Sequence, residues 1–332
     1  AADYIAGAFG LEGEPAAMTS RYIQVMVLFN IAYALSLVLS TAIRSVGDAQ
    51  TPMRYSMVAT AFNGFLCWVF LHGHLGAPAR GATGAALAGG IAPLVIYAVL
   101  AWRWWAGKLE LPYSSEGGKH NYGELVRIGT PAAVEQIMIQ ASLIMFMALV
   151  SNYGTAAFAA YGLGITILSA VIVVGYGFSI AGATLVAQYL GSRNPEQAYQ
   201  SAMRTLKLTT LAMTTLAILC FIFARTVSEF MVGDPVVVDA AVQFMWVLAG
   251  VMPIMAVEVS LAGALRGAGD TRTPLTATFS GLSTRLLGGL LMVYLEAPVL
   301  LLYGMLFLDY GVKVAILVWE FRKGRWMERK HQ

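Results

Sequence analysis

An eleven-residue segment that occurs twice in this chain constrains its fold more than any other feature of the sequence. Residues 264–274 repeat residues 42–52 at an offset of 222 positions with six identities, and both copies contain the pattern Arg-x-x-Gly-Asp-x-x-Thr-Pro. A repeat at a large, fixed offset indicates that one structural unit has been duplicated. The two copies therefore predict a fold built from two related halves.

Composition indicates what kind of unit was duplicated. Hydrophobic residues make up 58% of the chain and charged residues 12%, and the mean hydropathy is +0.69, whereas about a quarter of a soluble domain is charged. We therefore expect an integral membrane protein, and duplicated membrane units are typical of secondary transporters. The net charge of +3 does not indicate a nucleic-acid partner. Cys67 and Cys220 lie in apolar runs, which predict neither a disulfide nor a thiol metal site.

Apolar segments long enough to cross a bilayer, about 20 residues each, occur nine times and predict an all-α polytopic membrane protein. The predicted spans are residues 18–43, 52–72, 82–105, 125–150, 157–190, 200–224, 236–265, 275–296 and 298–320. The fifth span contains five glycines. A kinked or partly unwound helix is therefore an alternative to a continuous one there.

Lys and Arg residues predict the orientation of these spans, because cytoplasmic loops retain them. Sixteen of the 21 Lys and Arg residues fall on alternate loops and on the C-terminal tail. This pattern places both copies of the repeated turn, and the C-terminus, in the cytoplasm. Six predicted spans lie between the two turns, so the halves are expected to be parallel repeats of six helices.

The second half contains all six predicted helices, from the fourth span to the ninth. The same layout applied to the first half predicts that its first three helices are missing, so that nine helices of a 6 + 6 parent are visible. The predicted domains are a partial N-terminal lobe at 1–105, a cytoplasmic linker at 106–123, a C-terminal lobe at 124–322 and a cytoplasmic tail at 323–332. The linker is polar and contains Gly, Ser and Pro.

Four further motifs accompany the repeated turns in a characteristic order. They are residues 129–131 (Gly-Thr-Pro), 185–191 (Leu-Val-Ala-Gln-Tyr-Leu-Gly), 309–313 (Asp-Tyr-Gly-Val-Lys) and 321–326 (Phe-Arg-Lys-Gly-Arg-Trp). Together with the turns, they resemble the multidrug and toxic compound extrusion (MATE) family. The resemblance implies two six-helix lobes around a central cavity. It also implies a monomeric, non-enzymatic antiporter without cofactors, in a bacterial or archaeal cytoplasmic membrane, that exports amphipathic organic cations in exchange for protons or sodium ions.

Ionisable side chains inside a bilayer cost at least about 2.5 kcal/mol, so each needs a partner or a function. Five such residues lie deep inside the predicted spans, away from their ends, and all five are in the second half: Glu135, Glu258, Arg285, Asp309 and Lys313. At the 222-residue offset, the first half has Ser36 in place of Glu258 and Asn63 in place of Arg285. The buried charge therefore belongs to one half only.

Glu135 is the first candidate for the acid that binds the coupling ion. It follows Pro131 by four residues, and the proline frees a backbone carbonyl that could coordinate a cation beside the carboxylate. The alternative is a buried glutamate that only hydrogen-bonds a neighbouring helix. Glu258 is the second candidate, with an ion pair to Arg285 as its alternative. The resemblance places the family's acids about one turn away from each of the two.

Asp309 and Lys313 stand four residues apart on one helical face and predict a stabilising ion pair. The repeated turns are expected to be architectural, because glycine permits a tight turn and a Thr-Pro pair can start the next helix as N-cap and N1. The residues concerned are Arg44, Gly47, Asp48 and Pro52 in the first turn, and Arg266, Gly269, Asp270 and Pro274 in the second.

Other functions remain open from the sequence alone. A flippase for a lipid-linked oligosaccharide, in the same larger group as the MATE family, would be favoured by a cavity rich in arginine. A membrane scaffold without transport activity, or a product that is inactive because it is truncated, is a third alternative. An intramembrane enzyme would need a catalytic constellation, which the sequence does not offer, and we expect no metal site.

Overall fold

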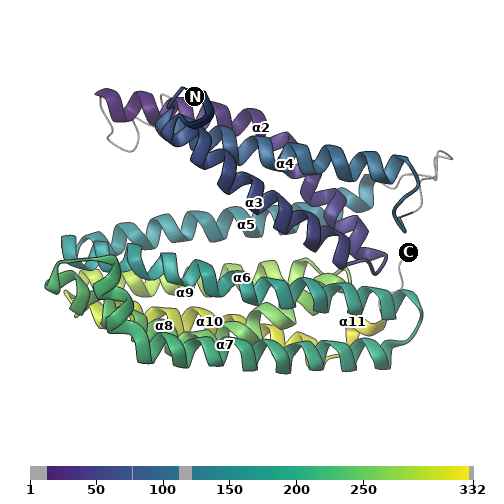
Figure 1. Cartoon of the computed structure of the whole chain (residues 1–332). Coiled ribbons are helices and arrows are strands. Elements are labelled where there is room, and N and C mark those ends of the chain that lie inside the picture. The colour runs from purple at the N-terminus through teal and green to yellow at the C-terminus, as the bar shows by residue number, and fades with distance from the viewer. Residues whose placement is uncertain (1–12, 77, 112–121, 329–332) are drawn as a thin grey trace. The chain divides into compact units, whose positions relative to one another are not determined.

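The computed structural model describes residues 13–76, 78–111 and 122–328, and this part of the chain is helical with no strand. The long helices are α2 (Gly13–Ser45), α3 (Gln50–His72), α4 (Gly81–Trp105), α5 (Tyr122–Ser151), α6 (Thr155–Gly191), α7 (Pro195–Met231), α8 (Pro235–Gly267), α9 (Arg272–Tyr294) and α10 (Val299–Arg322) (Figure 1). Two short elements complete them, η1 (His74–Gly76) and α11 (Arg325–Glu328). The nine predicted helices are thus confirmed.

Eight of these helices are long and apolar enough to cross a membrane, as an integral membrane protein requires. The remaining long helix, α9, is less apolar, because its 23 residues include two arginines and several hydroxyl side chains. The alternative of an unwound fifth span is wrong, since α6 is continuous over 37 residues. Its glycines include sites of close packing, as at Gly182, where an added Cβ would lie 2.7 Å from Cγ2 of Thr205.

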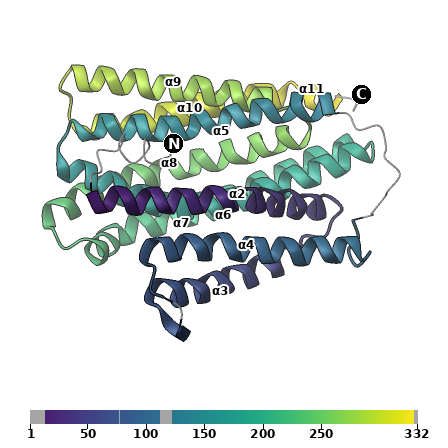
Figure 2. The same cartoon turned by 90° about the horizontal axis from the view of Figure 1, so that it is seen from above.

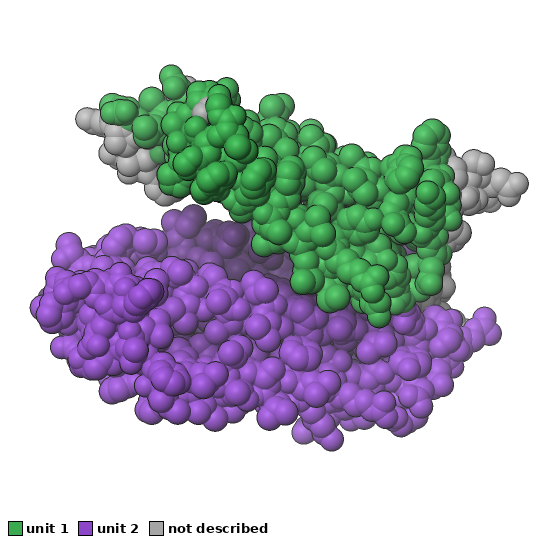
Figure 3. All heavy atoms as spheres, viewed as in Figure 1, with its two compact units in different colours: residues 1–119 green, residues 120–332 purple. Residues whose placement is uncertain are grey.

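The chain divides into two compact units, residues 1–119 and residues 120–332 (Figure 3). The division falls within the stretch predicted as a linker, of which residues 112–121 lie outside the described part. Unit 1 consists of α2 and α3 packed against α4, with a core of Leu39, Ile43, Ile96 and Leu100. The exact lobe, linker and tail boundaries stay a prediction.

The helix boundaries reproduce the sequence repeat. A shift of 222 residues carries α2 (13–45) onto α8 (235–267) and α3 (50–72) onto α9 (272–294). The turns between them also match, because Gly47 and Gly269 both adopt a left-handed backbone, with φ of 101° and 78°. The duplicated unit is therefore a helix–turn–helix element of fixed length.

One detail of the predicted turns is wrong. Thr51 and Thr273 are not N-caps, because α3 and α9 already begin one residue earlier, at Gln50 and Arg272. The carboxylates of the preceding aspartates take the capping role instead. Oδ1 of Asp48 accepts from the Thr51 backbone N–H at 2.9 Å, and Oδ1 of Asp270 accepts from that of Thr273 at 3.1 Å.

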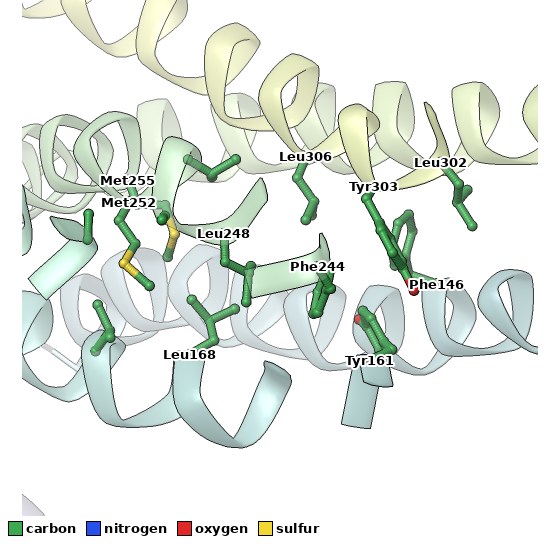
Figure 4. Packing of buried hydrophobic residues seen from close by; sticks show 14 of the residues in the cluster. Phe146, Tyr161, Leu168, Phe244, Leu248, Met252, Met255, Leu302, Tyr303 and Leu306 are labelled. Carbon is green, nitrogen blue, oxygen red and sulfur yellow. The ribbon is translucent and has the colours of Figure 1, made fainter. Parts of the chain in front are cut away.

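Six long helices, α5 to α10, form unit 2 and run side by side along a roughly common direction (Figures 1 and 2). Helix α8 packs against α6, α7 and α10, and α9 packs against α5 and α10. The buried residues of the main core come from α5, α6, α7, α8 and α10, and partly buried residues of α9 pack against them. Four aromatic rings from α5, α6, α8 and α10 interlock in this core (Figure 4). These rings are Phe146, Tyr161, Phe244 and Tyr303, with centroid separations of 5.6, 5.2 and 4.5 Å along the series.

Candidate functional site

A cavity of about 100 Å³ lies inside unit 2, bordered by α5, α6, α8, α9 and α10. Most of its walls are apolar, but five ionisable side chains of opposite sign reach it: Glu135, Glu258, Arg266, Arg285 and Lys313. Pockets for drug-sized ligands usually measure about 300–1,000 Å³. The cavity is therefore suited to water or a small ion.

Glu135 of α5 is buried and already has two donors on one carboxylate oxygen. Its Oε1 accepts from Nη2 of Arg266 at 2.7 Å and from the Thr278 hydroxyl at 2.9 Å. Arg266, which was predicted only to fix the repeated turn, therefore reaches back from the end of α8 to the cavity. Its side chain remains 30% exposed, whereas that of Glu135 is 4% exposed. This ion pair ties the turn directly to the buried acid.

Helices α5 and α9 lie side by side and present two matching contacts. Thr278 donates to Glu135, and seven residues further along both helices Arg285 donates to Ser142. Seven residues are two helical turns, about 10.5 Å, and return to the same face. The constant sequence separation of 143 residues in both contacts shows that the two helices run parallel.

A buried cluster of three charges lies beside the cavity. Asp309 is fully buried, and its carboxylate oxygens lie 3.3 Å from Nη1 of Arg285 and 2.8 Å from Nζ of Lys313. The predicted pair of Asp309 with Lys313 is therefore present. The alternative pair of Glu258 with Arg285 is wrong, because Arg285 is bound to Asp309 and Ser142 instead.

Glycine at position 281 makes this cluster possible. An added Cβ there would lie 2.7 Å from the backbone oxygen of Asp309 and 2.7 Å from Cγ of Lys313. Helix α9 can therefore approach α10 only because residue 281 has no side chain. The close approach brings Arg285, one turn further along α9, to the carboxylate of Asp309.

Glu258 of α8 lines the cavity, and in the described part of the chain it accepts no hydrogen bond and forms no ion pair. The two other acids of the site, Glu135 and Asp309, are each held by basic side chains. A charged group inside the membrane without a partner is costly and generally functional. Glu258 is therefore the carboxylate that remains available for an ion.

Three residues of the site were missed by the sequence interpretation: Ser142, Thr278 and the inward reach of Arg266. Ser and Thr are common in membrane helices, so their presence alone carries no signal. The seven-residue spacing from Glu135 to Ser142 and from Thr278 to Arg285 was visible. It indicates a function only once α5 and α9 are known to be neighbours, which the sequence does not reveal.

Apolar helices, a duplicated helix–turn–helix element and a buried charged cavity together define a polytopic membrane protein of the kind that moves solutes. The family model described as MatE matches residues 1–69 and 131–291, more than half of the chain. The chain belongs to this family, the MATE transporters, and the resemblance inferred from the sequence motifs is confirmed.

Relatives and solved structures agree with this assignment. The chain is 26% identical to a probable multidrug resistance protein NorM of Thermotoga maritima, covering 96% of this chain and 70% of the relative. It is also 26% identical to the multidrug resistance protein NorM of Aliivibrio fischeri, covering 84% of this chain and 62% of that relative. The solved outward-facing structure of a multidrug resistance MATE family transporter matches 99% of this chain and 74% of that one, with a TM-score of 0.89 at 16% identity.

Proposed function

We propose that this protein exports organic cations, including drugs, in exchange for protons or sodium ions, and that the cavity of unit 2 holds the coupling ion. Family membership and relatives named as multidrug resistance proteins support the export of drugs. The proposal further places the protein in a cytoplasmic membrane, with the C-terminus in the cytoplasm, because of the distribution of Lys and Arg.

One observation carries the assignment of the coupling site. Among the residues that the structure describes, Glu258 forms no hydrogen bond or ion pair; it lies on a central helix of an apolar bundle and lines a cavity of ion size. The geometry reverses the order of the two candidates, because Glu135 is already neutralised by Arg266. We therefore assign the main coupling role to Glu258 and a supporting role to Glu135.

Coupling requires that ion and substrate bind differently in the inward-open and outward-open states. A cavity of about 100 Å³ cannot hold a drug-sized molecule beside the ion. The substrate must therefore bind elsewhere in the protein. Occupancy of Glu258 would then bias the equilibrium between the two states.

Gradient-driven efflux from proteoliposomes tests the proposal. Efflux of a cationic dye such as ethidium should accelerate when a proton or sodium gradient is imposed, and Glu258→Gln should abolish the acceleration. Glu320→Gln is the matched control, because it removes a carboxylate of a partly exposed pair with Lys323 on α10, outside the cavity. The proposal fails if neither gradient accelerates efflux, or if Glu258→Gln responds like the unaltered protein.

A flippase for a lipid-linked, anionic cargo is the second candidate. It is supported by the three basic side chains that line the cavity, and by a 25% identical relative named as an FAD transporter in Shewanella oneidensis. However, Arg266 is engaged by Glu135, and both Arg285 and Lys313 are engaged by Asp309. None of these three groups is free to bind a pyrophosphate, so we favour the export of cations.

A further inference from the structure

The two repeated turns differ in a way that bears on the identity of the coupling ion. Arg266 of the second turn lines the cavity and donates to Glu135. Its counterpart at the 222-residue offset is Arg44 of unit 1, which pairs with no carboxylate in the described part of the chain. The two equivalent arginines of the repeated turns therefore have different environments.

We infer that Arg266 determines which ion the cavity accepts: its guanidinium holds Oε1 of Glu135, an oxygen that a metal cation would need, and leaves Glu258 to bind a proton. The inference rests on the proposed function and names the coupling ion of the same cavity. Arg266 is, in this account, a specificity-determining residue that acts through Glu135.

A sodium ion in a membrane protein is held by several oxygen ligands that replace its water shell. Oε1 of Glu135 already accepts two hydrogen bonds, from Arg266 and from Thr278. A sodium ion coordinated by Oε1 would therefore have to displace the guanidinium of Arg266.

A proton makes a smaller demand on the site. It forms a single O–H bond with a carboxylate oxygen of Glu258, needs no shell of ligands and removes a buried charge. In each transport cycle, the proton would come from water on one side of the membrane, reside on Glu258, and return to water on the other side. On the first side a hydronium O–H bond breaks as the Glu258 O–H bond forms, and on the other side the Glu258 O–H bond breaks as a water molecule takes the proton.

The surroundings of Glu258 agree with this assignment. Facing it across the cavity are Glu135 from α5, Tyr161 and Tyr176 from α6, Arg285 from α9, and Tyr310 and Lys313 from α10. Its own helix contributes Arg266, and α7 contributes no titratable side chain to the described lining. A metal ion would enter this space beside three basic groups, of which two share the single carboxylate of Asp309.

Sodium binding can be measured directly, as the shift of the thermal unfolding midpoint on adding NaCl. Choline chloride at equal concentration controls for ionic strength. We expect no sodium-specific shift for the unaltered protein and a clear one for Arg266→Gln, in which Glu135 is released. Arg44→Gln is the matched control and should behave like the unaltered protein. Arg266→Lys keeps the positive charge and should, like the unaltered protein, show no sodium-specific shift of the unfolding midpoint.

Transport gives a second readout. Ethidium efflux by the unaltered protein should respond to a pH gradient and not to a sodium gradient, and Arg266→Gln should gain a response to sodium. A sodium-specific shift or sodium-driven efflux in the unaltered protein would overturn the inference, and so would a folded Arg266→Gln variant that ignores sodium. If Arg266→Gln does not fold, a sodium-specific shift or sodium-driven efflux in the unaltered protein would still overturn the inference.

Failure of this inference can be told apart from failure of the proposed function. Efflux driven by sodium in the unaltered protein contradicts the role of Arg266 but leaves cation-coupled export intact. Efflux that ignores both gradients contradicts the proposed function, whereas the sodium-binding comparison of Arg266→Gln with Arg44→Gln remains a valid test of Arg266.

Discussion

Replacing Asp309 with asparagine should destabilise the protein more than any other single isosteric change in the charged site. Asp309 is the shared partner of Arg285 and Lys313, and the three side chains are at most 6% exposed. Asparagine keeps the shape that fits against Gly281 but removes the negative charge. Two buried cations are then left close together without their counter-ion.

The size of the effect follows from the burial of this cluster. Removing one partner of a buried ion pair typically costs about 3–5 kcal/mol, because an uncompensated charge remains in a medium of low dielectric constant. Arg285 retains its hydrogen bond to Ser142, whereas Lys313 loses its only ion pair in the described part of the chain. We therefore expect the loss for Asp309→Asn to lie in this range, and Asp309→Asn/Lys313→Met to lose less.

The free energy of unfolding can be measured by denaturant titration of the purified protein in detergent or bicelles. Glu320→Gln serves as the control on the same helix, since its pair with Lys323 is about a quarter exposed on both sides and pairs near the surface contribute at most about 1 kcal/mol. If Asp309→Asn costs no more than Glu320→Gln, the reasoning about the buried cluster is wrong.

Two further predictions concern packing and pH. Gly281→Ala should lower the free energy of unfolding by about 1–3 kcal/mol through overpacking, because the added Cβ would meet the Asp309 backbone. Gly311→Ala is the control, because an added Cβ there has open space. Equal stability of the two variants would refute the packing argument. Hydrogen bonds from Thr51 hold the pKa of Asp48 below its usual value of 3.8, so the stability that Asp48 contributes is present above pH 3.8 and is lost as pH falls below it. The stability difference between the unaltered protein and Asp48→Ala, measured from pH 6 to pH 3, should therefore narrow towards acid, and a difference that widens would contradict this assignment.

Most of the fold could be predicted from the sequence, because apolar length and the repeated turn are local signals. All nine long helices follow from them, and the 222-residue offset reproduces the boundaries of α2, α3, α8 and α9. The capping of the turns was predicted less well. Thr-Pro is a general start signal, but which residue caps depends on the side-chain geometry of Asp48 and Asp270.

Most charged residues of the site and the pair of Asp309 with Lys313 could be predicted, but the inward reach of Arg266 and the other pairings could not. Glu135, Asp309 and Lys313 stand out because charge is rare in membrane helices, and the i, i+4 spacing of Asp309 and Lys313 is a local signal. The partners of Glu135 come from a turn and a helix more than 130 residues away. Only the packing of α5, α8 and α9 shows that Glu258 forms no hydrogen bond or ion pair with the described residues.

Proton release on substrate binding tests most directly the claim that Glu258 carries the coupling ion. Ethidium would be added to the purified protein in weakly buffered detergent solution, and the pH change would be followed with an indicator dye. We expect the unaltered protein to release protons and Glu258→Gln to release none, with Glu320→Gln as the control. Undiminished release from Glu258→Gln, or no release from the unaltered protein, would contradict the account.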